Sequence, residues 1–226
     1  MAVSLSERSR QNRLVRFMAT IAKTRSASVP AVPAPACSEE SPQLYRFCLA
    51  QYEQMGRLGI LMEDDRVELV EGVLYTKPMK VGPHSISARE TAAALTRLIP
   101  AEAYFVTRED PVRIPGRDGM PEPDVSVVRG RSRDYTEQPD CGDVPLLVEV
   151  AGNSLTFDRT EKLLAYTGVG IPVYWIVNLV DRVVEVYSDP GPDGYRSRQI
   201  YTSGQVIDVV IDGVTLGQVA VVELLP

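Results

Sequence analysis

Apolar side chains recur at helical spacing in three segments of the chain. Ser41 and Pro42 suit the first positions of a helix, and apolar residues follow them at intervals of three and four. These apolar residues are Leu44, Phe47, Cys48, Tyr52 and Met55. A second helix is predicted over residues 83–99, which start with one proline and are followed by another. Asp158 and Glu161 have the spacing of a capping box and predict a third helix, which ends at the next glycines.

Short apolar runs between these segments predict strands. Residues 66–70 and 73–77 flank Glu71 and Gly72 and predict a hairpin. Further strands are predicted at 103–107, 112–114, 124–128, 146–150, 173–177 and 183–187, with shorter strands after them. The run at 146–150 is apolar enough to be buried on both faces of a sheet. This succession of helices and strands predicts an α/β domain.

Residues 1–40 differ in composition from the rest of the chain. They are rich in Arg, Ser, Ala and Pro, and proline lacks the amide proton on which helices and sheets depend. We expect a flexible basic tail at 1–40 and a folded domain at 41–226, with a transit peptide or a start codon assigned too early as alternatives for the tail. The tail carries six basic and three acidic residues, which leaves 18 basic and 27 acidic residues in the domain. An acidic domain does not attract phosphate backbones in general, so nucleic-acid binding would depend on a local basic patch or a metal.

Composition excludes several classes of protein. No window approaches eighteen consecutive apolar residues, so we expect no membrane span, and the three cysteines form no CxxC pair, which suits a reducing cytoplasm. Motifs of serine hydrolases, P-loop proteins and Rossmann domains are missing. Because His84 is the single histidine, the chain cannot build a multi-histidine zinc site. Any metal would be held mainly by carboxylates, which favour Mg²⁺, Mn²⁺ or Ca²⁺.

Three carboxylates lie in or beside apolar strands, where an ionised group is costly unless a partner or a metal offsets its desolvation. Each has a structural explanation when taken alone: Glu68 could pair with Arg66, Asp124 could cap a turn, and Glu149 could project from a sheet edge. Three together favour a functional site. Lys162 adds to this pattern, because a cation in the first turn of the predicted third helix is disfavoured by the helix dipole unless carboxylates lie nearby.

Five segments of the chain, spread over about residues 42–190, resemble the bacterial Uma2-like proteins (DUF820) of the PD-(D/E)xK nuclease superfamily. They are RVELVEG at 66–72, PHS at 83–85, PEPDVSVV at 121–128, LLVEV at 146–150 and DRTEKLLAYTGVGIPVYWIV at 158–177. The last two, in this order and at this separation, are the most specific. The resemblance implies a restriction-endonuclease-like α/β fold, with a central mixed β-sheet flanked by helices and additional C-terminal strands.

The resemblance also implies roles for individual residues. In that superfamily the PD aspartate and the acidic residue of the next strand hold a divalent ion, an earlier glutamate assists them, and a lysine activates or orients the attacking water. At the matching positions of this chain stand Asp124, Glu149, Glu68 and Lys162. Ala151 occupies the usual lysine position, so Lys162 corresponds to a variant with the lysine on the following helix. His84 is a secondary candidate, for phosphate contact or proton transfer, with a purely structural histidine as the alternative. The loop AGNSLTFD after Glu149 departs from the family's Ser-Pro-Ser-Thr run, which puts contacts made there in doubt.

Together these features predict a Mg²⁺-dependent endonuclease that hydrolyses DNA phosphodiester bonds, with Mn²⁺ as a substitute ion. A carboxylate-bound Mg²⁺ can neutralise the charge that develops on a phosphate and make a water more nucleophilic. One alternative is a non-catalytic protein that keeps the fold to bind nucleic acid or a protein partner, and another is a metal-dependent hydrolase of a different phosphoester. Cutting both strands of a duplex suits a two-fold assembly, so a homodimer fits the first hypothesis.

Overall fold

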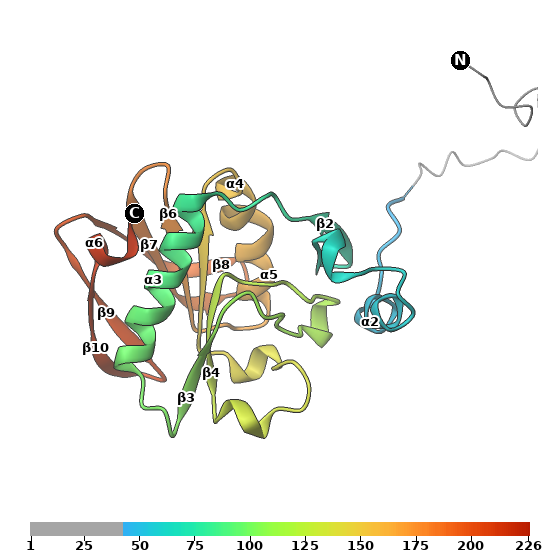
Figure 1. The fold of residues 1–226 in the computed structure, drawn as a ribbon, viewed down its shortest axis with the longest axis horizontal. Helices are drawn as coiled ribbons and strands as arrows, with labels where there is room; N and C mark the ends of the chain where they lie inside the picture. Colours follow the sequence, from blue (N-terminus) through green and yellow to red (C-terminus); the bar gives the residue numbers. More distant parts are fainter. Residues whose placement is uncertain (1–42) are drawn as a thin grey trace, which may run out of the picture. The chain divides into compact units, whose positions relative to one another are not determined.

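The computed structural model describes residues 43–226, of which Leu44–Pro226 form one compact unit (Figure 1). The predicted tail at 1–40 and the helix start predicted at Ser41 and Pro42 lie outside these residues. No helix within residues 43–226 is long and apolar enough to cross a membrane.

The centre of the fold is a six-stranded sheet with the order β3-β4-β5-β6-β7-β8. Its strands are β3 (Tyr104–Thr107), β4 (Val125–Arg129), β5 (Leu146–Ala151), β6 (Val173–Asn178), β7 (Val183–Gly191) and β8 (Gly194–Thr202). Strands β5 and β6 run parallel, whereas the other neighbouring pairs run antiparallel, so the sheet is mixed. The predicted α/β fold with a central mixed sheet flanked by helices is confirmed.

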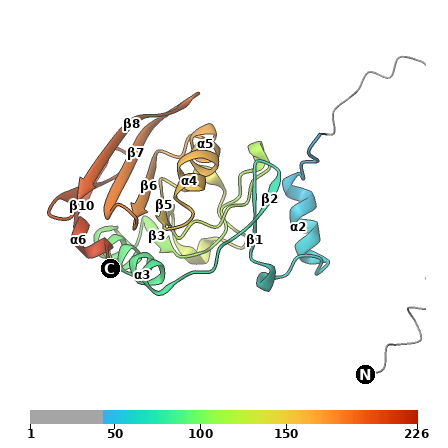
Figure 2. The ribbon, with the colours of Figure 1, turned by 90° about the horizontal axis from the view of Figure 1, so that it is seen from above.

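Helices cover both faces of this sheet, and each face has its own apolar core (Figure 2). On one face lies α3 (Gly82–Leu98), which packs with α6 (Val221–Leu224) and with the separate hairpin of β9 (Val206–Ile211) and β10 (Val214–Ala220). The opposite face is covered by the crossover from β5 to β6, which consists of α4 (Leu155–Phe157), the π-helical turn η5 (Asp158–Lys162) and α5 (Leu163–Gly168). The β9–β10 hairpin accounts for the additional C-terminal strands.

Alternation along the strands divides the sheet residues between the two cores. In β5, Leu146, Val148 and Val150 pack on the α3 side, whereas Leu147 and Ala151 pack on the α5 side. Successive side chains of a strand point to opposite faces, so Glu149 shares the α5 side. All six residues of β5 are buried, which agrees with the prediction for this run.

A second hairpin, formed by β1 (Val67–Val70) and β2 (Val73–Thr76), carries the early carboxylate of the predicted site. Its turn uses Glu71 at φ 51° and Gly72 at φ 75°, and two positive φ angles are typical of a type I′ hairpin turn. The hairpin attaches to the segment before β4, because the Met120 amide donates to the Leu69 carbonyl at 2.8 Å. This attachment brings β1 to the start of β4.

Helix α2 (Leu49–Arg57) begins later than the sequence predicts. Residues 43–48 are not helical, and the Phe47 amide instead donates to the Gly72 carbonyl at 2.8 Å. The prediction of helix at residues 43–48 was wrong because a bond to the distant hairpin turn, and not the local apolar spacing, fixes this segment.

Two strand predictions also need correction. Residues 112–114 form isolated bridges instead of a strand, because Arg113 pairs with Asp140 while the next residue pairs with Gly119. Strand β7 extends beyond its predicted end at residue 187, since Pro190 pairs with Tyr195 inside the β7–β8 ladder. Within residues 43–226, single turns of 3-10 helix lie in the connections at η1 (Glu63–Asp65), η2 (Pro115–Arg117), η3 (Ser132–Asp134) and η4 (Cys141–Asp143).

Candidate active site

The register between β4 and β5 brings Asp124 and Glu149 together. Val125 pairs with Val148 in this antiparallel ladder, so Asp124, one residue before β4, lies beside Glu149. The Val150 amide donates to Asp124 Oδ2 at 2.8 Å and fixes that carboxylate at the end of the ladder. Both residues are at least 95% buried, on a sheet whose strands form from otherwise apolar runs.

Lys162 joins Glu149 to the β1 hairpin. Its Nζ lies 2.9 Å from Glu149 Oε1 and 3.1 Å from Glu68 Oε2, and the Tyr166 hydroxyl donates to the same Glu149 oxygen at 2.8 Å. Glu68 Oε2 also accepts a hydrogen bond of 3.0 Å from the amide of Glu122. Glu68 therefore pairs with Lys162, while the Arg66 guanidinium donates to a backbone carbonyl, that of Pro78.

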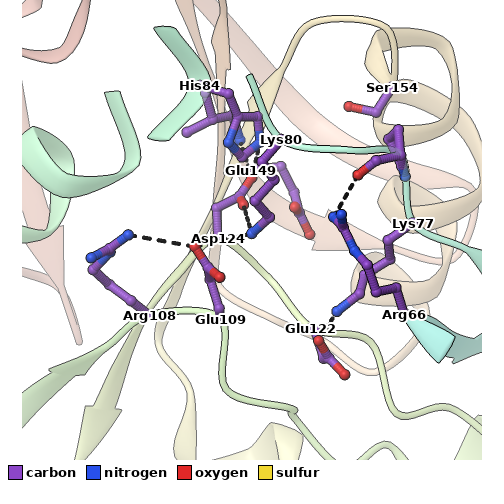
Figure 3. A network of polar contacts seen from close by, with 12 residues as sticks. Arg66, Lys77, Lys80, His84, Arg108, Glu109, Glu122, Asp124, Glu149 and Ser154 are labelled. Atoms are coloured by element: carbon purple, nitrogen blue, oxygen red, sulfur yellow. Dashed lines mark hydrogen bonds and ion pairs between the residues drawn. The ribbon is translucent and has the colours of Figure 1, made fainter. Parts of the chain in front are cut away.

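Two basic side chains, Lys80 and His84, converge on Asp124 (Figure 3). Lys80 Nζ lies 3.0 Å from Asp124 Oδ1, and His84 Nε2 lies 3.2 Å from Asp124 Oδ2. Lys80 also lies 3.1 Å from Glu109. Lys80 comes from the connection between β2 and α3, and His84 comes from the first turn of α3.

The surroundings of the two central carboxylates move their pKa values in opposite directions. Burial raises the pKa of Asp124, but the hydrogen bond and charge of His84, the Lys80 ammonium and the Val150 amide outweigh it and lower the pKa to about 2. For Glu149, burial is the largest effect, and repulsion from Asp158, Asp124 and Glu68 adds to it. Lys162 opposes this shift only in part, so the pKa of Glu149 rises to about 8.

Lys162 remains protonated in this environment. Burial lowers its pKa, but the neighbouring carboxylates Glu149, Glu68 and Asp158 outweigh the burial, so the pKa lies above its ordinary value. The positive charge is thus held by the same carboxylates whose repulsion it relieves. This explains how a fully buried ammonium is stable at this position.

The sequence predicted that Asp158 caps a helix, but in the structure it does not. The helical segment begins at Leu155, and Asp158 lies inside it, 98% buried, where it accepts a 2.7 Å hydrogen bond from the Ser154 hydroxyl. Burial raises the pKa of Asp158 to about 6. Lys162 is therefore also outside the first helical turn. Its environment is determined by the neighbouring carboxylates and not by the start of a helix. Single π-helical turns inside α-helices are frequent at functional sites.

All five residues proposed from the sequence line one cavity of about 300 Å³. These residues are Glu68, His84, Asp124, Glu149 and Lys162. The sequence analysis missed Lys80, which lies in a connection without periodicity, and Tyr166, which looked like an ordinary apolar position of α5. It also assigned Asp158 to a cap, although an acidic residue four positions before a candidate lysine on one helical face was a usable signal.

The carboxylates of the cavity fit a hard divalent cation by their chemistry. Asp124, Glu149 and Glu68 supply oxygen ligands, and their mutual repulsion, seen in the raised pKa of Glu149, is what a bound cation would relieve. In the arrangement described for residues 43–226, no three His, Cys, Asp or Glu side chains are grouped closely enough to hold a metal. Lys162 lies between Glu149 and Glu68, and Lys80 and His84 occupy both oxygens of Asp124.

Comparison with a solved structure agrees with the fold. The structure is described as "a putative nuclease belonging to DUF820 from Anabaena variabilis ATCC 29413", and the two chains superpose with a TM-score of 0.60 at 16% sequence identity. The match covers 79% of this chain and 97% of the other. At this identity the likeness establishes the fold alone. No curated protein matches the chain.

A sequence model of one family, named Uma2 and described as "Putative restriction endonuclease", matches residues 49–218. The match includes every residue that lines the cavity, from Glu68 in β1 to Leu179 after β6. The chain therefore belongs to the Uma2 family of restriction-endonuclease-like proteins.

Proposed function

We propose that this protein is a Mg²⁺-dependent endonuclease that hydrolyses DNA phosphodiester bonds in the cavity described above. The observation that carries the proposal is the convergence of Asp124, Glu149, Glu68 and Lys162 from separate elements in one buried pocket. Burying three carboxylates together opposes folding, and a requirement to bind a cation explains why the fold nevertheless does so.

Mg²⁺, or Mn²⁺ in its place, would be held by Asp124, Glu149 and Glu68, and when bound would supply positive charge for the phosphate and lower the pKa of a water. Asp124 is ready for this role at every physiological pH, because its pKa is lowered to about 2. Glu149 has a pKa of about 8, so it must release a proton to become a ligand near neutral pH. Cation affinity should therefore increase between pH 6 and pH 8.

Lys162 supplies a fixed positive charge at the bottom of the cavity. Because it is protonated and held by Glu149 and Glu68, it can stabilise negative charge that develops on a phosphate. His84 holds Asp124 through Nε2, while its buried Nδ1 has no hydrogen-bond partner among residues 43–226. We assign His84 to the orientation of Asp124 through this contact of Nε2.

The direct test is cleavage of supercoiled plasmid and of a labelled oligonucleotide by the whole chain, with Mg²⁺, Mn²⁺ or EDTA. Wild-type protein should cut only with a divalent ion, and Asp124→Asn and Glu149→Gln should each reduce cutting by at least about 100-fold, the scale of removing a major electrostatic contribution. Glu161→Gln, an exposed glutamate on the same turn as Lys162, should cut like wild type.

Two results would contradict the proposal. Folded protein that cuts no DNA and binds no Mg²⁺ or Mn²⁺ in calorimetry would favour the non-catalytic hypothesis. Hydrolysis of bis(p-nitrophenyl) phosphate without any cleavage of DNA would favour a hydrolase of another phosphoester.

A further inference from the structure

The carboxylates of the proposed site are deeply buried in the lining of a small cavity. Glu68, Asp124 and Glu149 are between 3% and 5% exposed, and the cavity of about 300 Å³ is at the small end of the range for ligand pockets. A phosphate on the outside of a rigid duplex would have to reach past the entrance to contact them. A flexible strand can enter one nucleotide at a time.

The cavity has an aromatic wall next to the carboxylates. Tyr75 of β2 and Phe157 of α4 both line it, with ring centroids 4.6 Å apart and an angle of 51° between the rings. Both rings are partly exposed. Every nucleobase has a π-face, so aromatic side chains bind unpaired bases with little dependence on sequence. In a duplex the faces of the bases are already stacked on each other.

Apolar residues continue this wall to the entrance of the cavity. Met79 and Val81 line the cavity and are 83% and 63% exposed, in the connection between β2 and α3. Lys80, between them, turns inward to Asp124. The entrance therefore presents apolar surface where a duplex-binding site would present cations to the phosphates.

The neighbouring groove does not supply those cations. This groove, of about 1370 Å³, shares Lys77, Met79, Lys80 and Glu122 with the cavity, and its lining includes six basic and seven acidic side chains. Five of its six basic residues are paired with carboxylates; Arg113, for example, contacts both Glu53 and Asp140, and Lys77 contacts Glu122. The sixth, Arg66, donates to the Pro78 carbonyl. Duplex affinity depends on neutralising many phosphates, and this surface has little unpaired positive charge for that purpose.

We infer that the substrate of this site is an unpaired DNA strand, whose base packs on Tyr75 and Phe157 while its phosphate reaches the carboxylates. This inference rests on the proposed nuclease function and specifies its substrate. Single strands, frayed ends and flaps all present such a nucleotide, and an intact duplex does not. The small cavity and its aromatic wall fit this substrate, because stacking of an unpaired base on an aromatic ring adds affinity to the phosphate contacts.

The test compares binding of a labelled single strand with binding of the same sequence as a duplex. Fluorescence anisotropy is measured on the whole chain with Ca²⁺ at 150 mM NaCl, and a gel of the same samples checks that the DNA stays intact. The same single strand and duplex are then incubated with the protein and Mg²⁺ to measure cleavage. We expect the single strand to bind and be cut at least about 10-fold better than the duplex.

Tyr75→Leu removes the ring but keeps an apolar side chain, and it leaves Lys162 itself unchanged. It should weaken single-strand binding by about 5- to 100-fold, the range for losing one base stack, and should leave duplex binding unchanged. Tyr75→Phe keeps the ring and should bind like wild type. Phe47→Leu is the matched control, because Phe47 is also half-buried against one aromatic neighbour, Tyr45, but lines neither the cavity nor the groove.

Each outcome separates this inference from the nuclease proposal. Equal or better binding of the duplex, or unchanged single-strand binding by folded Tyr75→Leu, would overturn the inference even if DNA is cut. Tyr75-dependent binding of the single strand without cleavage of any DNA would support the inference about the strand and contradict the nuclease proposal.

Discussion

Replacing Glu149 with glutamine should change how the stability of the protein depends on pH. Glutamine has the same shape and keeps an acceptor oxygen for Lys162 and Tyr166, which both contact Glu149 Oε1. It cannot ionise. The comparison therefore isolates the energetic consequence of holding a carboxyl group in this buried position.

The magnitude follows from the raised pKa of Glu149. In the unfolded chain the group loses its proton near its ordinary value of 4.5, whereas in the folded protein it keeps the proton until about pH 8. Between these values the folded state binds more protons, so the free energy of unfolding falls as pH rises, by up to about 1.4 kcal/mol per pH unit. From pH 5 to pH 7.5 this amounts to about 3 kcal/mol, which Glu149→Gln should not lose.

The assay is urea denaturation of wild type and Glu149→Gln at pH 5, 6, 7 and 8 without divalent ions. The difference between their unfolding free energies should shift steadily in favour of the variant as pH rises. Asp158, whose pKa is raised to about 6, contributes a slope of the same sign, but it is present in both proteins. Glu161→Gln should follow the wild-type curve. Parallel curves for wild type and Glu149→Gln would refute the claim that burial and neighbouring carboxylates keep Glu149 protonated.

Three further predictions concern the site and the hairpin that carries Glu68. Lys162→Met leaves the buried Glu68 carboxylate without its cation and removes the donor to Glu149, so it should destabilise the protein by about 3 to 5 kcal/mol at pH 7 and lower cleavage. Calorimetry should still detect Mg²⁺ binding, and its loss would contradict the role assigned to Lys162. The pKa of Asp124 is lowered from 3.8 to about 2, so the stability that its carboxylate contributes should be present above pH 3.8 and be lost as the pH falls to 2. Acid titration followed by circular dichroism should show that wild type loses about 2 kcal/mol more of its unfolding free energy than Asp124→Asn in this window. Gly72→Ala places a Cβ on a residue with φ 75° and 2.8 Å from Arg46 Cβ, so it should lower the unfolding free energy in urea by about 1 to 3 kcal/mol. Gly142→Ala, which has open space around it, should stay within about 0.5 kcal/mol of wild type.

Much of the local structure could be predicted from the sequence alone. The apolar runs that form β4, β5 and β6 and the proline at the start of α3 specify their elements by spacing and composition. The same runs exposed the unusual carboxylates Asp124 and Glu149, because a charged residue stands out in a strand that is otherwise apolar. These signals are local, so they need no knowledge of which segments meet.

Tertiary structure decided the partners of each charged group. Lys162 contacts Glu149, 13 positions away, and Glu68, 94 positions away, while Asp124 receives Lys80 and His84 from the connection before α3 and its first turn. Ion pairing depends on distances between side chains from different elements, and apolar periodicity contains no information about such distances. The pKa values follow from these distances and from burial, so they too belong to the folded state.

The segments at residues 43–48 and 154–162 illustrate the same division. Both segments contain residues that favour helix formation or capping, and the sequence shows this directly. In the first segment, however, the hydrogen bond from Phe47 to Gly72 keeps the backbone out of the helix. In the second, packing against the sheet moved the helix start to Leu155 and turned Asp158 from an expected cap into a buried member of the cavity. Local propensities differ by about 1 kcal/mol or less, so long-range hydrogen bonds and burial decide between alternatives that the sequence leaves nearly equal.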